Sequence, residues 1–307
     1  MSSKSIQSRL AKGYFYLTDR KSKHSKKWFL KNNQSSEPYS NISNQIILQE
    51  SFNDRPLWKI RPANNVSERT IMFVHGGAFA KNFQPLHWKF VSRLVTNLNA
   101  EIIAPDYPLL PTATFAVTHQ YFLDLFRELA SQINIEEMYI IADTSGATIA
   151  LNAVQQFRNY GIPQPKELIL LSPWLDLSLS NPNIDSLVDS DPIHDREVLQ
   201  DLAIDYAHNL PVNDPSISPI YADTRRIAPI TVFVGTHDIL WADCRKLKTL
   251  SESKPVVFNY REFDGMFNNW MYYDIPEGRK AREQLFFHIM SEPSEFEKAM
   301  QENILAW

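Results

Sequence analysis

The stretch MYIIADTSGA, residues 138–147, decides the fold expected for this chain. Its first five residues are apolar and include a tyrosine and two isoleucines, which is typical of a buried strand. Small and polar residues follow at once, and a helical pattern then occupies 146–160. A strand that turns directly into a helix is the repeating unit of a parallel sheet.

The same alternation continues on both sides of this stretch. The first strands come as a hairpin-like pair, and the later ones alternate with helices. This order predicts an α/β fold with a mostly parallel, twisted sheet covered by helices on both faces. The expected strands are 45–49, 57–61, 70–74, 101–104, 138–142, 167–171, 230–234 and 256–260, and the expected helices are 86–98, 115–132, 146–160, 241–252 and 279–291.

The alternating pattern also sets the expected domain boundaries. Residues 1–44 are predicted to form a basic N-terminal arm, 45–292 a single core, and 293–307 a C-terminal tail. A proline-rich, partly helical insertion at about 180–225 interrupts the core. We expect this insertion and the arm to form a cap over the functional site.

The N-terminal arm differs in charge from the rest of the chain. Residues 1–33 hold nine Lys or Arg and one acid, a net charge of +8, whereas the remainder has a net charge of −12. The arm is either a site for anionic lipid or nucleic acid, or a solvated terminal segment. The near-helical spacing of Ile6, Leu10, Tyr14 and Leu17 favours a segment that docks on the protein's own body.

The overall composition excludes several classes of protein. No apolar run approaches the roughly 18 residues of a membrane span, and the N-terminus lacks the apolar core of a secretory signal. The single cysteine, Cys244, excludes an internal disulfide and a cysteine-based metal cage. We therefore expect a cytoplasmic protein with no integral membrane segment, no cofactor and no nucleic-acid partner, because no nucleic-acid motif appears.

The loops at the carboxyl ends of the strands should carry the ligand site. They read HGGAF at 75–79, PDYPLLP at 105–111, ADTSGA at 142–147, SPWLDLS at 172–178, GTHDIL at 235–240 and FDGMF at 263–267. In order and spacing they resemble the hormone-sensitive-lipase group of the α/β-hydrolase fold, a family of carboxylesterases and lipases. The resemblance covers about residues 45–291.

The resemblance implies an oxyanion loop and an acid. The family's HGGG-type loop looks like Gly76, Gly77 and Ala78, with His75 as structural support. The acid of the family's catalytic triad looks like Asp238. Homodimers that form through the last strand and helix are common in this family, so the resemblance also implies that this chain could form a homodimer.

The nucleophile and the base of the triad are both changed. The family motif G-D-S-A-G-G aligns with A-D-T-S-G-A, so Thr144 takes the place of the serine, between Asp143 and the pair Ser145 and Gly146. The catalytic histidine lies in an H-G-F-like loop, and Asp264 takes its place. Alanines at 142 and 147 replace two glycines of the elbow, which suggests that this strained turn has relaxed.

These substitutions predict impaired catalysis. A β-branched residue is costly at the positive φ of a nucleophile turn, and a carboxylate with an ordinary pKa of about 3.9 is a poor base at neutral pH. The glycine loop, Gly76–Ala78, would still offer free backbone amides to an anion. The leading hypothesis is an esterase-like protein with a degenerate triad that binds a small acyl or carboxylate ligand.

Other functions remain open from the sequence. One is an active carboxylic-ester hydrolase that uses Thr144 with a non-standard base such as His237; another is an interaction or scaffold protein. Ser145 is grouped with Gly76, Gly77 and Ala78 as a candidate oxyanion or ligand-binding residue. Its side chain is not expected to replace Thr144 as the nucleophile, because one helical step rotates it by about 100°, so that it misses the oxyanion hole. Asp143, Asp238 and Asp264 are not expected to bind a metal ion, since Asp143 is better explained as a helix cap.

Overall fold

The computed structural model describes residues 4–18, 25–31, 35–38, 44–64, 66–67, 69–252 and 256–291. The predicted C-terminal tail at 293–307 lies outside the described residues, and so does part of the basic arm, including residues 19–24.

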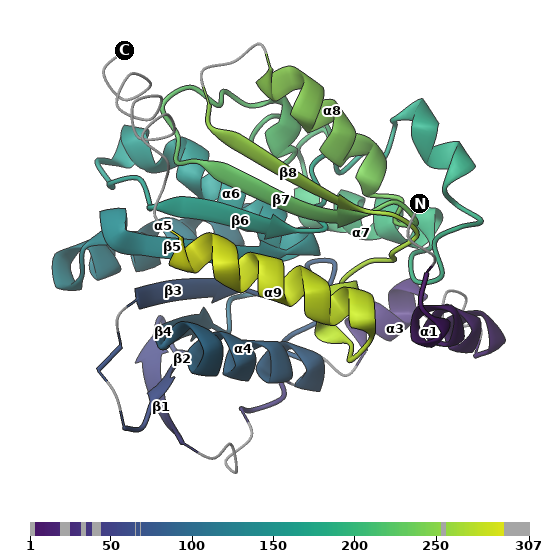
Figure 1. Ribbon diagram of the computed structural model, residues 1–307. Helices are drawn as coiled ribbons and strands as arrows, with labels where there is room; N and C mark the ends of the chain where they lie inside the picture. Colours follow the sequence, from purple (N-terminus) through teal and green to yellow (C-terminus); the bar gives the residue numbers. More distant parts are fainter. Residues whose placement is uncertain are drawn as a thin grey trace.

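An eight-stranded sheet with the order β1-β2-β4-β3-β5-β6-β7-β8 runs through the molecule (Figure 1). The pairs β1–β2 and β2–β4 are antiparallel, and every other pair is parallel, so the predicted hairpin and mostly parallel sheet are confirmed. The strands are β1 (Gln45–Phe52), β2 (Arg55–Pro62), β3 (Arg69–Val74), β4 (Ala100–Pro105), β5 (Met138–Asp143), β6 (Glu167–Leu171), β7 (Ile230–Gly235) and β8 (Phe258–Phe263).

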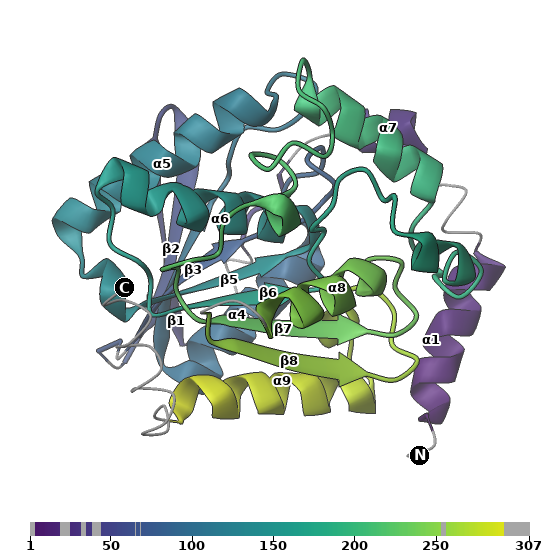
Figure 2. The same ribbon diagram turned by 90° about the horizontal axis from the view of Figure 1, so that it is seen from above.

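Helices cover both faces of the sheet (Figure 2). The α-helices are α1 (Ile6–Leu17), α3 (Lys26–Leu30), α4 (Pro85–Leu98), α5 (Phe115–Gln132), α6 (Thr144–Phe157), α7 (Arg196–Ala207), α8 (Trp241–Ser251) and α9 (Pro276–Met290). The 3₁₀ helices are η1 (Ile135–Glu137), η2 (Arg158–Tyr160), η3 (Pro182–Ser186), η4 (Pro219–Tyr221) and η5 (Trp270–Tyr272). None of the described helices has the length and apolar character needed to span a bilayer.

The core has two halves because strand side chains alternate between the faces of the sheet. In β3, Ile71 and Phe73 pack with residues of α4 and α9, whereas Met72 and Val74 pack with residues of α5 and α6. All four side chains are fully buried. A strand buried on both faces reads as a continuous apolar run, and this is why β3 and β5 were recognisable in the sequence.

The N-terminal helix α1 lies beyond the carboxyl ends of β7 and β8 (Figures 1 and 2). Its Phe15 ring packs edge-on against Phe267 and Tyr273, with ring centroids 5.1 and 5.6 Å apart. The Tyr16 hydroxyl donates to the backbone carbonyls of Asp189 and Ser190, both at 3.0 Å. The helix therefore contacts the core and also the long segment that links β6 to β7. It docks on the protein's own body as predicted, but the apolar residues on which that prediction rested are exposed: Ile6, Leu10, Tyr14 and Leu17.

Candidate active site

The strand-to-helix turn at Thr144 keeps a strained backbone. Thr144 follows β5 directly, begins α6 and has φ +47°, in the left-handed region that a β-branched residue rarely adopts. The prediction that Ala142 and Ala147 relax this turn is therefore wrong. Thr144 is only 5% exposed, so its hydroxyl lies beneath the surface.

The loop after β3 lies against this turn. A Cβ added to Gly76 would be 3.0 Å from the Cβ of Thr144. Gly77, Ala78 and Phe79 all have positive φ, so the loop curls back on itself. Among the residues that the structure describes, none accepts a hydrogen bond from the amides of Gly77 or Ala78. The predicted glycine loop thus holds two backbone donors beside Thr144.

Ser145 has a supporting contact within this loop. Its side chain is fully buried, and its Oγ accepts a hydrogen bond of 3.2 Å from the amide of Phe79. The hydroxyl therefore ties the glycine loop to the first turn of α6.

His75 also supports the loop. Its buried ring stacks on Tyr107 with centroids 4.5 Å apart, and the Tyr107 hydroxyl donates to the His75 carbonyl at 2.5 Å. Burial lowers the pKa of His75 to about 4, so the ring is neutral at neutral pH. These contacts give it a structural place behind the loop.

The acid position Asp238 is buried and hydrogen-bonded. Its Oδ1 accepts from the amide of Leu240 at 3.0 Å, and its Oδ2 accepts from Nδ2 of Asn268 at 3.0 Å. In a catalytic triad the residue that donates to the acid is the base. Asn268 therefore lies where a triad would have its histidine.

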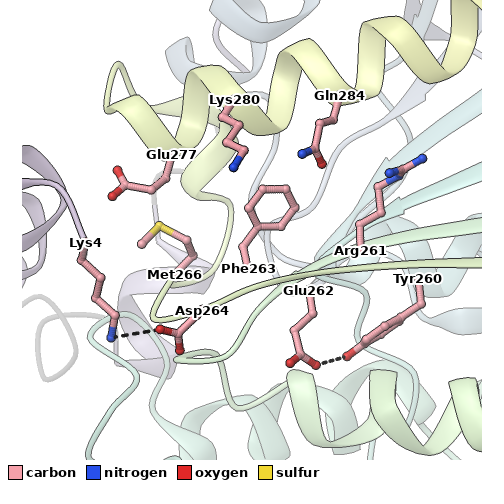
Figure 3. A pocket seen from close by; sticks show the side chains of 10 residues that line it. All are labelled: Lys4, Tyr260, Arg261, Glu262, Phe263, Asp264, Met266, Glu277, Lys280 and Gln284. Atoms are coloured by element: carbon pink, nitrogen blue, oxygen red, sulfur yellow. Dashed lines mark hydrogen bonds and ion pairs between the residues drawn. The ribbon is translucent and has the colours of Figure 1, made fainter. Parts of the chain in front are cut away.

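Asp264, by contrast, lies at the surface. Its side chain is 80% exposed, and its carboxylate lies 3.9 Å from Nζ of Lys4. Figure 3 shows the two residues together at a groove between β8 and α9. The assignment of the base position to Asp264 is therefore wrong, because the side chain of this loop that contacts Asp238 is that of Asn268. The loop after β8 continues past Gly265, and this moves the position to Asn268.

A second asparagine contacts Thr144 itself. Nδ2 of Asn269 donates to Oγ1 of Thr144 at 3.1 Å and to Oδ2 of Asp143 at 2.9 Å. Neither asparagine is among the site residues predicted from the sequence. The only signal for them was an adjacent pair of amides in a loop that also carries the candidate Asp264.

Asp143 does not cap α6, contrary to the sequence-based interpretation. Its side chain makes no cap hydrogen bond; instead Oδ2 accepts from the Tyr272 hydroxyl at 2.6 Å as well as from Asn269. Burial raises the pKa of Asp143 to about 7, although the hydrogen bonds from Tyr272 and Asn269 act in the opposite direction.

This shift predicts a pH-dependent stability. The pKa of Asp143 is higher in the folded chain than its ordinary value. The protonated carboxyl therefore contributes fully to the free energy of unfolding below pH 4, and this contribution is lost as the pH rises to 7. At 1.36 kcal/mol per pKa unit, the loss between pH 5 and pH 8 is about 3 kcal/mol. Asp143→Asn should escape this loss. In urea unfolding, the free energy of unfolding of the variant relative to that of wild type should therefore rise by about that amount between the lower and the higher pH.

The control is Asp201→Asn, which changes an exposed carboxylate on α7. Its free energy of unfolding should differ from that of wild type by the same amount at both pH values. A constant difference for Asp143→Asn as well would mean that Asp143 is ionised throughout this range.

Behind Asp238 lies a buried group with the spacing of metal ligands. Among the described residues, the donor atoms of Asp191, His194 and Asp238 lie within 4.8 Å of one another. Asp191 is already engaged: its Oδ2 pairs with Nδ1 of His194 at 2.9 Å and accepts from the amide of Ile239 at 3.0 Å. Burial acts to raise the pKa of Asp191, but His194 and backbone amides outweigh it, and the net shift is downward. We interpret the group as support for Asp238.

His237, the alternative base, contacts the N-terminal helix. Its Nδ1 contacts Nζ of Lys12 on α1. Burial and the lysine both lower the pKa of His237. The ring therefore links the loop after β7 to α1.

Comparison with known proteins agrees with this geometry. The model of the α/β-hydrolase fold family matches residues 71–272, which is more than half of the chain. The chain belongs to the α/β-hydrolase fold family. This confirms the fold predicted from the loop motifs, and the strand-turn-helix at Thr144 lies inside the matched range.

Similar proteins are esterases and acetyl-hydrolases. The chain is 27% identical over 246 residues to an esterase of Acinetobacter venetianus, covering 75% of this chain and 81% of the relative. It is 28% identical over 229 residues to an acetyl-hydrolase of Streptomyces hygroscopicus, covering 73% and 76%. A solved esterase of the bacterial hormone-sensitive lipase family superposes with a TM-score of 0.79 at 20% identity, covering 94% of this chain and 98% of that one. The chain is thus an esterase/lipase-like α/β-hydrolase.

Proposed function

We propose that this esterase-like protein has severely impaired ester hydrolysis and binds a small acyl or carboxylate ligand beside Thr144. The observation that carries the proposal is the hydrogen bond from Nδ2 of Asn268 to Asp238. A triad base must accept the proton of the nucleophile, and an amide nitrogen does not do so at neutral pH. The buried acid is retained, but the group that it would orient cannot act as a base.

The threonine contributes to the impairment. Its Oγ1 accepts a hydrogen bond from Asn269, which reduces the electron density available for attack. Its side chain is also almost wholly buried, and its extra methyl group occupies space that a substrate carbonyl would need.

Ligand binding rests on the backbone donors that remain. The loop that holds Gly77 and Ala78 lies against the first turn of α6, through Gly76 beside Thr144 and the hydrogen bond from Phe79 to Ser145. In that first turn, helix amides have no intrahelical partner and the helix dipole favours negative charge. A carboxylate resembles the oxyanion that such donors stabilise in an esterase. We infer that α1 and the segment between β6 and β7 form the cap that limits ligand size.

The first test compares wild type with Thr144→Ala on p-nitrophenyl acetate near neutral pH. We expect the two rates to agree within about twofold, because neither protein has a base for the nucleophile. Titration of the same samples with butyrate, which has no ester bond, should give similar affinities. A wild-type rate tenfold or more above that of Thr144→Ala would contradict the proposal and make Thr144 a working nucleophile.

The alternative is an active carboxylic-ester hydrolase, and the names of the similar proteins favour it. The same assay distinguishes the two, since only the active enzyme loses its rate when Thr144 is truncated. In that case the Asp143–Asn269 pair would be the first groups to test for a role in activating the hydroxyl.

A further inference from the structure

Helix α1 has one face that packs against the protein and one face that is exposed. Its inner face is held by Phe15, which is 3% exposed, and by Ser8, which is 1% exposed. The Ser5 hydroxyl at its N-cap donates to Glu277 of α9 at 2.7 Å. These contacts fix the rotation of the helix about its axis and decide which residues point outward.

The outer face of α1 is defined here as Ile6, Leu10, Tyr14 and Leu17. These side chains are 72%, 67%, 63% and 89% exposed, respectively. At 100° per residue they fall on one stripe, opposite Ser8 and Phe15. Single exposed apolar residues are ordinary on a protein surface, but four on one side of a 12-residue helix form a patch that indicates an interaction surface.

Charge identifies the partner. The outer face lies in the segment 1–33, with its net charge of +8, while the rest of the chain has a net charge of −12. Arg9, on α1 itself, is exposed beside the stripe, and Lys27 on α3 is exposed as well. An anionic surface would attract this end of the molecule and repel the remainder. An apolar stripe with an exposed arginine beside it, in a segment of net charge +8, fits a helix that lies in the interface of an anionic bilayer.

We propose that the outer face of α1 binds the surface of a membrane that contains anionic lipid, with the helix lying in the plane of the membrane. The leucine and isoleucine side chains enter the headgroup region, and Tyr14 is suited to the interface by its apolar ring and polar hydroxyl. Arg9, which is exposed beside the stripe, contacts the lipid phosphates and carboxylates.

This surface lies at the same end of the sheet as the candidate site. Lys12 of α1 contacts His237 in the loop after β7, and Lys4 lies 3.9 Å from Asp264 in the loop after β8. The loop after β8 also carries Asn268 and Asn269. Membrane binding would therefore hold the carboxyl ends of the strands near the lipid, where acyl compounds concentrate.

The test is sedimentation of the full chain with two kinds of vesicle, pure phosphatidylcholine and phosphatidylcholine mixed with phosphatidylserine. We expect binding to the mixed vesicles only, weakened by high salt. Leu10→Gln/Leu17→Gln should lower the partition constant at least about tenfold. The matched control is Phe287→Gln on α9, which removes an equally exposed apolar side chain, 70% exposed, from another surface and should bind as wild type does.

Each outcome of this test either supports or overturns the proposal. Both substitutions replace exposed side chains, so thermal unfolding should be unchanged and a loss of binding cannot be assigned to misfolding. If wild type does not sediment with the mixed vesicles, the proposal is overturned. Binding that survives Leu10→Gln/Leu17→Gln would also overturn it, since basic residues alone would then be responsible. A dimer that the double substitution converts to a monomer, with no vesicle binding, would assign the face to a second copy of the chain.

Discussion

Thr144→Ser combined with Asn268→His is expected to raise hydrolysis of a p-nitrophenyl ester at least about 100-fold over wild type. The serine removes the methyl group and the cost of a β-branched residue at φ +47°. The histidine replaces the amide that now donates to Asp238, so one ring nitrogen can keep this contact while the other accepts the serine proton. The acid and the glycine loop are already in place. The rate should be measured near pH 7.5, with each single substitution alongside.

A matched control separates this site from the one that sequence alignment suggested. Thr144→Ser/Asp264→His introduces the same two residue types, but its histidine replaces an exposed side chain paired with Lys4. It should stay within a few-fold of Thr144→Ser. If the Asp264→His combination gains activity and the Asn268→His combination does not, the base position is Asp264 after all. If neither gains, the retained acid and loop do not form an active geometry.

The single substitutions add a further distinction. Members of a triad act as a unit, so each change alone should yield little of the gain that the pair yields. Asn268→His alone keeps the threonine at the nucleophile position. Thr144→Ser alone keeps the Asn268 side-chain amide, which cannot act as a base. A large gain from Asn268→His alone would mean that Thr144 can serve as a nucleophile once a base is supplied.

Most of the fold could be predicted from the sequence because buried parallel strands are apolar along their whole length. The runs at 138–142 and 70–74 lie within β5 and β3, and the helix expected at 115–132 matches α5. The order of the loop motifs then fixed which strand ends meet. Tertiary packing did not override these local patterns, since both faces of the sheet are covered as predicted.

The site was predicted less completely. Thr144 directly follows β5, and Asp238 lies in the short loop between the end of β7 at Gly235 and the start of α8 at Trp241, so the strand and helix patterns locate both. Asn268 and Asn269 lie in the irregular loop after β8, which has no periodicity, so alignment there depended on a single glycine, Gly265. The alignment on this glycine placed the base position at Asp264, four residues before Asn268. Only the side-chain contacts of the structure could correct it.

The turn at Thr144 also depends on distances that sequence does not reveal. The sequence predicts that alanines at 142 and 147 relax it, but both side chains are fully buried and the left-handed backbone is kept. The reason is that another glycine of the motif, Gly146, still allows α6 to approach β3 closely. A Cβ built on Gly146 would lie 2.3 Å from the carbonyl oxygen of His75 and 2.4 Å from that of Val74.

Gly146→Ala is therefore expected to destabilise the protein by more than about 3 kcal/mol. The obstructing atoms are backbone oxygens at the end of a central strand, so they cannot move aside as a flexible side chain would. Relief requires α6 to shift away from β3, which would also displace Thr144 and Ser145 from the glycine loop. Denaturant unfolding measures the loss, and butyrate titration of the folded variant measures the damage to the site.

Gly13→Ala makes the same chemical change where there is room. Gly13 lies within α1, and a Cβ there would meet nothing within 4 Å. Alanine is favoured over glycine inside a helix by up to about 1 kcal/mol, so this variant should be as stable as wild type or slightly more so. If Gly146→Ala falls within about 0.5 kcal/mol of Gly13→Ala, the close approach of α6 to β3 is not what holds the turn at Thr144. A large difference between the two would instead mean that the clash of the new methyl group with the backbone oxygens of Val74 and His75, rather than helix propensity, destabilises the Gly146→Ala variant.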